Sequence, residues 1–168
     1  MEDNKNLILR NAQIINKNFE GREEKPYNPA GSRNFTILLD EDISKKLLDD
    51  GWNIHIRERD DGSSIGYLRV AVNYSNPRML PKVVQVTETA SGKIKKTLLT
   101  ESTIANIDAS EIEDVKLEIR PRVWYNNATK EVGGIKAYLK TMYFTLIKDV
   151  FEDDYPEDDD DDGVPFEV

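Results

Sequence analysis

The chain has 168 residues, of which 38% are hydrophobic and 33% are charged, and its formal net charge is -9. This length suits one domain with a core of its own and is too short for two comfortable ones. The sequence contains no cysteine, which excludes disulfides, thiolate metal sites and cysteine nucleophiles and fits a reducing compartment.

The N-terminal residues carry no signal for export or for membrane insertion. Met1 to Asn6 lacks the cationic start and the apolar centre of a signal peptide. No stretch of the sequence reaches the roughly 18 apolar residues that a membrane-spanning helix requires. We therefore expect a soluble, cytoplasmic protein with no membrane partner.

Alternation of β-branched or aromatic residues with polar ones predicts seven strands along the chain. The expected strands are Leu7 to Ile15, Asn34 to Leu39, Trp52 to Arg59, Ile65 to Tyr74, Lys82 to Thr87, Val115 to Trp124 and Gly134 to Ile147. Turn residues separate several of them, as at Asp60-Asp61-Gly62 and at Gly133-Gly134. The short, irregular spacing favours a mainly β fold, an antiparallel barrel or sandwich, over alternating βαβ units.

Only two segments have a helical pattern. Asp40 is placed to cap a helix from Glu41 to Asp50, which Gly51 would end. A shorter helix is expected from Thr100 to Asp108. Residues 16–33 contain glycine and proline among charged side chains, and they predict an exposed, mobile loop between the first two strands.

The negative charge is concentrated at the C-terminus. Residues 152–168 hold ten of the 32 acidic residues and no basic one, so the remaining 22 acids nearly balance the 23 lysines and arginines. We expect a folded domain over residues 1–151 and a disordered acidic tail over residues 152–168. The tail runs from Asp158, Asp159, Asp160, Asp161 and Asp162 to Val164, Pro165 and Phe166. An exposed phenylalanine adds nothing to solubility, so this tip suggests partner binding.

Because side chains alternate across a strand, each predicted strand can be divided into two faces. One face of each of four strands is apolar. The opposite faces together carry eight lysines and arginines and a single acid, Glu118. The eight basic residues are Arg57, Arg59, Arg69, Lys116, Arg120, Arg122, Lys136 and Lys140.

The same faces carry aromatic residues, among them Tyr67, Trp124 and Tyr138. Single-stranded nucleic acid is bound by this mixture, because cations hold phosphates and aromatic rings stack on unpaired bases without regard to sequence. The alternative is a solvated sheet surface on which the rings belong partly to the core. The predicted DNA-binding residues are Arg57, Arg59, Tyr67, Arg69, Arg120, Arg122, Trp124, Tyr125, Lys136, Tyr138 and Lys140.

The motifs of enzymes and of metal sites are missing from the sequence. His55 is the only histidine, and neither a nucleophile elbow nor a glycine-rich phosphate loop occurs. The run from Asp158 to Gly163 begins like a calcium loop, but the twelfth ligand position would be residue 169, beyond the last residue. We expect a protein that is not an enzyme and that has neither a cofactor nor a metal site.

Two stretches give the chain a family resemblance. Val115 to Pro121 continuing through Gly134 to Lys140, together with the acidic tip Asp162-Gly163-Val164-Pro165-Phe166, resembles bacteriophage single-stranded DNA-binding proteins of the OB-fold type. The resemblance implies a decorated OB-like barrel, with Thr100 to Asp108 as the usual OB helix and Glu41 to Asp50 as an addition. The tip departs from the family pattern because Glu167 and Val168 follow Phe166.

The resemblance implies sequence-independent binding and protection of single-stranded DNA during phage replication or recombination, in the cytoplasm of the host cell. It also implies that the tail recruits replication or recombination proteins and folds back on the DNA groove when no strand is bound. Two alternatives remain open at this point: an acidic interaction protein or DNA mimic, and a virion structural component. Association into a homo-oligomer is also open.

Overall fold

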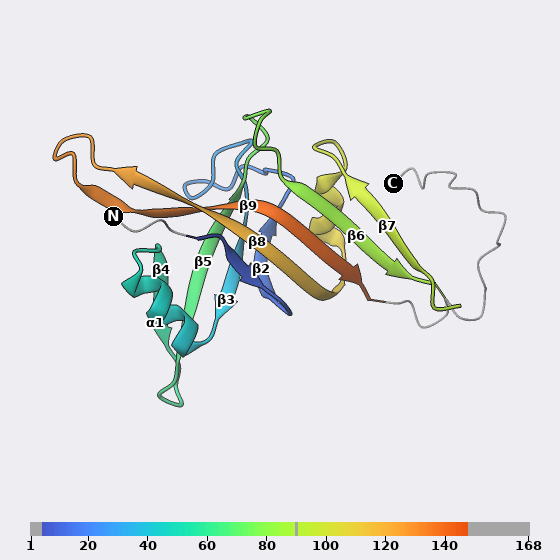
Figure 1. Ribbon diagram of the computed structural model, residues 1–168, viewed down its shortest axis with the longest axis horizontal. Coiled ribbons are helices and arrows are strands. Elements are labelled where there is room, and N and C mark those ends of the chain that lie inside the picture. The colour runs from blue at the N-terminus through green and yellow to red at the C-terminus, as the bar shows by residue number, and fades with distance from the viewer. Residues whose placement is uncertain (1–4, 90, 148–168) are drawn as a thin grey trace.

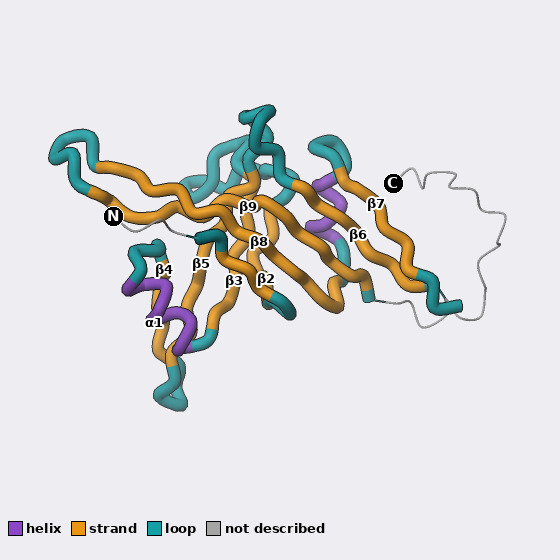
Figure 2. Tube along the Cα trace, in the orientation of Figure 1, coloured by secondary structure: helices purple, strands orange, loops and turns teal. Residues whose placement is uncertain are grey.

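The computed structural model describes residues 5–89 and 91–147 of the chain. All nine strands of this part belong to one sheet, and two short helices accompany them (Figures 1 and 2). The elements are β1 (Leu7–Leu9), β2 (Gln13–Asn18), β3 (Arg33–Leu39), α1 (Glu41–Asp49), β4 (Ile54–Glu58), β5 (Ser64–Val72), β6 (Lys82–Glu88), β7 (Ile94–Leu99), the 3-10 helix η1 (Ile104–Ala109), β8 (Ile112–Tyr125) and β9 (Val132–Leu146).

The N-terminal strand closes the sheet on itself. The strand order is β1-β8-β9-β5-β3-β2, so β1 and β2 lie at opposite ends of the series although only residues 10–12 separate them. At that junction Asn11 has a positive φ of 54°, and the amide of Ala12 donates to the carbonyl of Val115 on β8 (2.9 Å). The result is an OB-like barrel. Most strand pairs are antiparallel, whereas β9 runs parallel to both β5 and β6.

The barrel interior is filled by the apolar face of each strand. Phe19 and Phe35 stack at 5.2 Å between ring centroids, and Val70, Met142 and Phe144 are fully buried. The 3-10 helix η1 covers one end of the barrel, where its Ile104 and Ile107 are fully buried. The carboxylate of Asp108 accepts from the amides of Phe19 (2.8 Å) and Glu20 (3.0 Å), which fixes the end of β2 against η1.

Two insertions decorate the barrel. The first, α1 with β4, lies between β3 and β5, and the second is the hairpin β6–β7, which extends the sheet along the C-terminal half of β9 (Figure 1). The first insertion also supports the long hairpin of β8 and β9. Ile135 donates to the carbonyl of Gly51 (3.0 Å) and accepts from the amide of Asn53 (3.3 Å).

A bulge in β9 changes which side chains of that strand face the core. Strict alternation along β9 would turn either Leu139 or Met142 outward. Glu118 pairs with Thr141 and Ile119 pairs with Leu139, so Lys140 is an extra residue on β9. Because of this extra residue, Leu139, Met142 and Phe144 are all buried. The bulge lies directly before the apolar run from Met142 to Ile147.

The mainly β, OB-like architecture predicted from the sequence is confirmed, as are both helices. Asp40 caps α1 by accepting from the amide of Ile43 (2.9 Å). Three details differ: the predicted strand Leu7 to Ile15 is broken at Asn11, the second helix is the 3-10 helix Ile104–Ala109 rather than Thr100 to Asp108, and β7 was not predicted. In the described part of the chain no helix is long and apolar enough to cross a membrane. The tail and the boundary after residue 151 lie outside the described residues.

Gly66 of β5 tests how closely α1 packs on the sheet. A Cβ at this position would lie 2.7 Å from the Cβ of Ser44, a helix residue that is 1% exposed. We expect Gly66→Ala to lower the free energy of unfolding by about 1–3 kcal/mol, because helix and strand must separate. Urea unfolding followed by circular dichroism measures the change. Ser64→Ala, on the same strand, is the control and should change stability by less than about 0.5 kcal/mol.

Candidate nucleic-acid interface

The strand register places one row of side chains across the outer surface of four strands. Asn34 of β3 lies opposite Ala71 of β5, Ala71 lies opposite Tyr138 of β9, and Tyr138 lies opposite Arg120 of β8. Neighbouring strands are about 4.8 Å apart, so the row spans about 15 Å. We call this row and the adjoining residues Arg69, Arg122, Trp124 and Lys136 the outer face.

Cations on the outer face are placed against one another rather than against acids. Arg122 lies directly opposite Lys136, and the ammonium of Lys136 lies 5.3 Å from the ring centroid of Tyr138. Like charges directly opposite on a sheet are destabilising. Among the described residues, none of Arg120, Arg122 and Lys136 forms an ion pair. An anion that binds between them would relieve this repulsion.

Trp124 lies flat on a pair of glycines near the tip of the β8–β9 hairpin. It is 48% exposed, and it faces Gly134 across the two strands. A Cβ on Gly133 would overlap three atoms of the indole ring, so only glycine leaves room for the ring in this position. One indole face therefore rests on backbone.

Tyr67 and Arg69 extend the outer face along β5. The ring of Tyr67 lies 6.3 Å from that of His55 on β4. Arg69 lies opposite Thr36 and donates to the side-chain oxygen of Asn28 (2.9 Å). The only histidine is thus a sheet-surface residue beside a ring that was predicted to contact DNA.

Four of the eleven predicted residues do not belong to this group. Arg57, Arg59 and Tyr125 lie apart from it, and Lys140 is paired with an acid. Arg57 lies opposite Ile65, six residues along β5 from Ala71, and Arg59 lies in the turn beyond β4. Six residues of strand correspond to about 20 Å. Tyr125, 57% exposed, lies at the hairpin tip. The structure therefore groups Tyr67, Arg69, Arg120, Arg122, Trp124, Lys136 and Tyr138, with Arg57 and Arg59 toward the far end of the sheet.

Lys140, at the bulge, is held by Glu118. Its ammonium lies 3.3 Å from a Glu118 carboxylate oxygen that also accepts from Asn6 (3.0 Å). The Asn6 hydrogen bond and the Lys140 contact lower the pKa of Glu118, although desolvation opposes the shift. Glu118 thus stays ionised, and part of the Lys140 charge is neutralised.

The predicted loop between the first two strands covers residues 19–32 and joins β2 to β3; its position beside Arg69 was not predicted. It was expected to be mobile, but two asparagines anchor it. Asn18 accepts from the amides of Gly21 (3.1 Å) and Arg22 (2.9 Å), and Asn28 is 5% exposed. In OB folds the loop between the first two strands borders the nucleic-acid site, as does the loop between the last two. These loops are residues 19–32 and 126–131.

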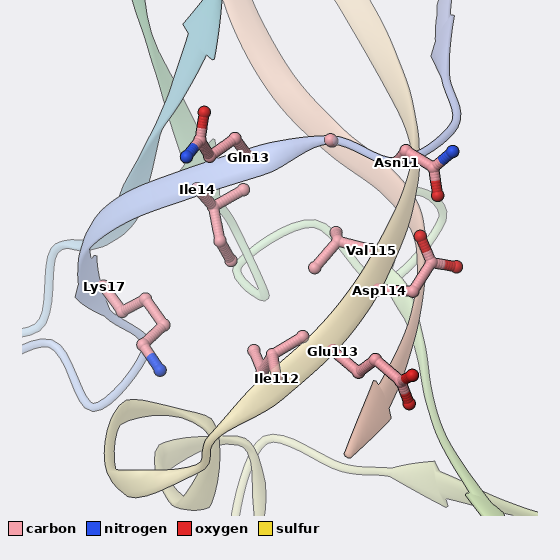
Figure 3. A pocket seen from close by; sticks show the side chains of 9 residues that line it. Asn11, Gln13, Ile14, Lys17, Ile112, Glu113, Asp114 and Val115 are labelled. Carbon is pink, nitrogen blue, oxygen red and sulfur yellow. The ribbon is translucent and has the colours of Figure 1, made fainter. Parts of the chain in front are cut away.

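A separate hollow lies where the N-terminal strand passes over β8 (Figure 3). Figure 3 shows Glu113 and Asp114 at one side of it and Lys17 at the other. The ammonium of Lys17 is engaged by the carbonyls of Ile107 (3.0 Å) and Ser110 (2.8 Å). The two carboxylates in its wall do not suit a phosphate chain. Across residues 5–89 and 91–147 no cluster of three metal-ligating side chains was found.

Comparison with known proteins supplies the family. The family model described as "Putative phage ssDNA-binding domain" matches residues 1–164. The chain therefore belongs to the phage single-stranded DNA-binding domain family, as its resemblance indicated. No curated protein matches the sequence.

The solved structures that are similar to this chain include two phage proteins. The single-stranded DNA-binding protein from bacteriophage Enc34, in complex with ssDNA, has a TM-score of 0.48 and 14% identity, covering 86% of this chain and 88% of that one. The single-stranded DNA-binding protein gp2.5 encoded by bacteriophage T7 has a TM-score of 0.38 and 10% identity, covering 92% and 97%.

The Trp124 platform gives a local test. We expect Gly133→Ala to displace the indole, because the added methyl would occupy the position of the ring. Tryptophan emission should shift, while Trp52, 4% exposed, contributes a constant signal. The adjacent substitution Val132→Ala is the control. Identical emission spectra for Gly133→Ala and the wild type would show that the indole does not rest on Gly133.

Proposed function

We propose that the outer face binds single-stranded DNA without regard to sequence. The supporting observation is the row in which Arg120 and Tyr138 stand side by side, flanked by the opposed cations Arg122 and Lys136. Phosphates would lie between these cations, and bases would stack on Tyr138, Trp124 and Tyr67. Every base has a stackable face, so such a surface discriminates little between sequences.

We further propose that the biological role is protection of single strands during phage DNA replication or recombination, in the host cytoplasm. In this proposal the protein acts by binding alone and catalyses no reaction. The acidic tail, with Val164, Pro165 and Phe166 at its tip, recruits replication or recombination proteins. In the absence of DNA the tail competes for the cationic outer face, because its ten acids imitate a run of phosphates.

The stacking platforms provide the main test. Replacing both Trp124 and Tyr138 with alanine should weaken binding of a fluorescently labelled oligo-dT by about 30-fold or more, since each stacked base contributes about 1–3 kcal/mol. Fluorescence anisotropy at two salt concentrations measures the affinity. The salt slope should stay close to that of the wild type, because the phosphate contacts remain.

Tyr143→Ala serves as the matched control for this experiment. Tyr143 is on β9 too, but beyond the bulge and opposite Lys116 rather than Arg120. Its loss should leave the affinity unchanged. Wild-type affinity in the double variant would contradict the proposed interface, and failure of the wild type to bind any oligonucleotide would contradict the function itself.

Deleting residues 152–168 tests competition by the tail. We expect the shortened chain to bind oligo-dT more tightly, most clearly at low salt, because charge attraction is screened beyond about 10 Å at 0.1 M salt. Titration at 20 mM and 200 mM salt separates the two conditions. A tail in which Asp158 to Asp162 are all asparagine should show part of the same gain. Equal affinities for full-length and shortened chains would rule out competition while leaving DNA binding intact.

A further inference from the structure

A polar cavity of about 520 Å³ lies between the loop of residues 19–32 and the outer surface of β3 and β5. Its volume is within the range of about 300–1,000 Å³ that is typical of small-ligand sites. Arg22, Glu24, Tyr27, Asn28, Asn34 and Arg69 contribute to its wall. Asn34 belongs also to the row that contains Tyr138, so the cavity is continuous with the outer face.

Asn28 holds the wall of the cavity together. Its side-chain NH2 donates to the carbonyls of Arg22 (2.8 Å) and Ser32 (3.0 Å), and its oxygen accepts from Asn34 (2.8 Å) and Arg69 (2.9 Å). A buried amide with its donors and its acceptor all engaged has one fixed orientation. Asn28 therefore sets the direction in which the Arg69 guanidinium points.

Charge in the cavity favours an anion. Lys17, Arg22 and Arg69 line it with one opposing carboxylate, Glu24. Lys17 is engaged by backbone carbonyls, and Arg22 lies 3.7 Å from Glu20. Within the described residues Arg69 has no ion-pair partner, and a neutral amide fixes it. Its remaining N–H groups suit a phosphate, which guanidinium can bind through two hydrogen bonds.

Tyr27 supplies an aromatic surface at the rim. Residues 24–28 form a closed turn, with the Glu24 amide donating to Asn28 (2.8 Å) and the Tyr27 amide to Glu24 (2.7 Å). The turn presents Tyr27 with 80% of its surface exposed. A ring left this exposed beside a cationic cavity contributes little to the core and is free to stack on a base.

We propose that this cavity is a subsite for one nucleotide of the bound strand, in which Arg69 holds the phosphate and Tyr27 stacks on the base. Asn28 is the positioning residue that aims Arg69. The inference rests on the proposed function, since the strand reaches the cavity from Tyr138 across β5. The loop of residues 19–32 then takes part in binding, beyond the strand surfaces that the sequence pattern indicated.

Photo-crosslinking tests contact with Tyr27. Full-length protein is irradiated with oligo-dT in which single positions carry 5-iododeoxyuridine, and crosslinked peptides are identified by mass spectrometry. We expect a crosslink at Tyr27 from some positions. Tyr27→Ala should weaken oligo-dT binding about 5-fold or more, Tyr27→Phe should retain it, and Tyr143→Ala should not change it.

Asn28→Asp tests the positioning of Arg69. Aspartate has the shape of asparagine, but it cannot donate to Arg22 and Ser32, and its charge would pair with Arg69. We expect weaker binding and a salt slope reduced by about 0.7, the amount for one phosphate contact on a single strand. Thermal unfolding of Asn28→Asp shows whether the variant is folded, so that weaker binding is not mistaken for misfolding. Tyr27→Ala changes an exposed residue and tests the subsite without affecting folding.

The outcomes separate the two proposals. Loss of affinity in the Trp124, Tyr138 double variant, with wild-type binding in Tyr27→Ala and no crosslink at Tyr27, would overturn the subsite while the outer face stands. An unchanged salt slope in folded Asn28→Asp would overturn the role of Asn28. Absence of oligo-dT binding by the wild type would overturn both.

Discussion

Closure of the barrel by the N-terminal strand is the constraint on which the interface depends. The N-terminal strand is interrupted at Asn11, and the amide of Ala12 donates to the carbonyl of Val115. The N-terminal segment therefore pairs with β8 through β1 and with β3 through β2. Closure joins the two edges of the sheet through residues 10–12. The loop of residues 19–32 follows β2 and the loop of residues 126–131 follows β8, so the same hydrogen-bond pattern fixes where both loops leave the barrel.

The positive charge of the outer face comes from where the basic residues lie and not from an excess of basic over acidic residues in the domain. Outside the C-terminal 17 residues, acids and bases are nearly equal in number, so the domain has no overall attraction for polyanions. In the proposed function, attraction arises because Arg120, Arg122 and Lys136 lie together without described ion pairs, whereas Lys140, at the bulge, is paired with Glu118. Local field, not net charge, governs association with a phosphate chain.

The strands and their faces were predictable because alternation is local information. Val70 and Arg69, or Ala137 and Tyr138, differ by one residue and point to opposite sides, as the pattern indicated. What the sequence could not supply depends on partners distant along the chain. The Lys140–Glu118 pair requires the register of β8 on β9, and the anchored loop requires Asn28 to meet Arg69, 41 residues away. β7 was missed because Ile94 and Leu98 face solvent, so its apolar residues do not mark a core face.

The insertion of α1 and β4 carries no residue of the outer face row, yet it bears on how that surface is shaped. The backbone of residues 51–53 bonds to Ile135, near the base of the long hairpin on which Trp124 lies. Beyond Ala137 the hairpin has no other neighbouring strand within the described chain, and a two-stranded ribbon by itself twists strongly. The insertion thus supports the hairpin from one side: it sets the tilt of the two strands beyond Ala137, and with it the curvature of the surface around Trp124.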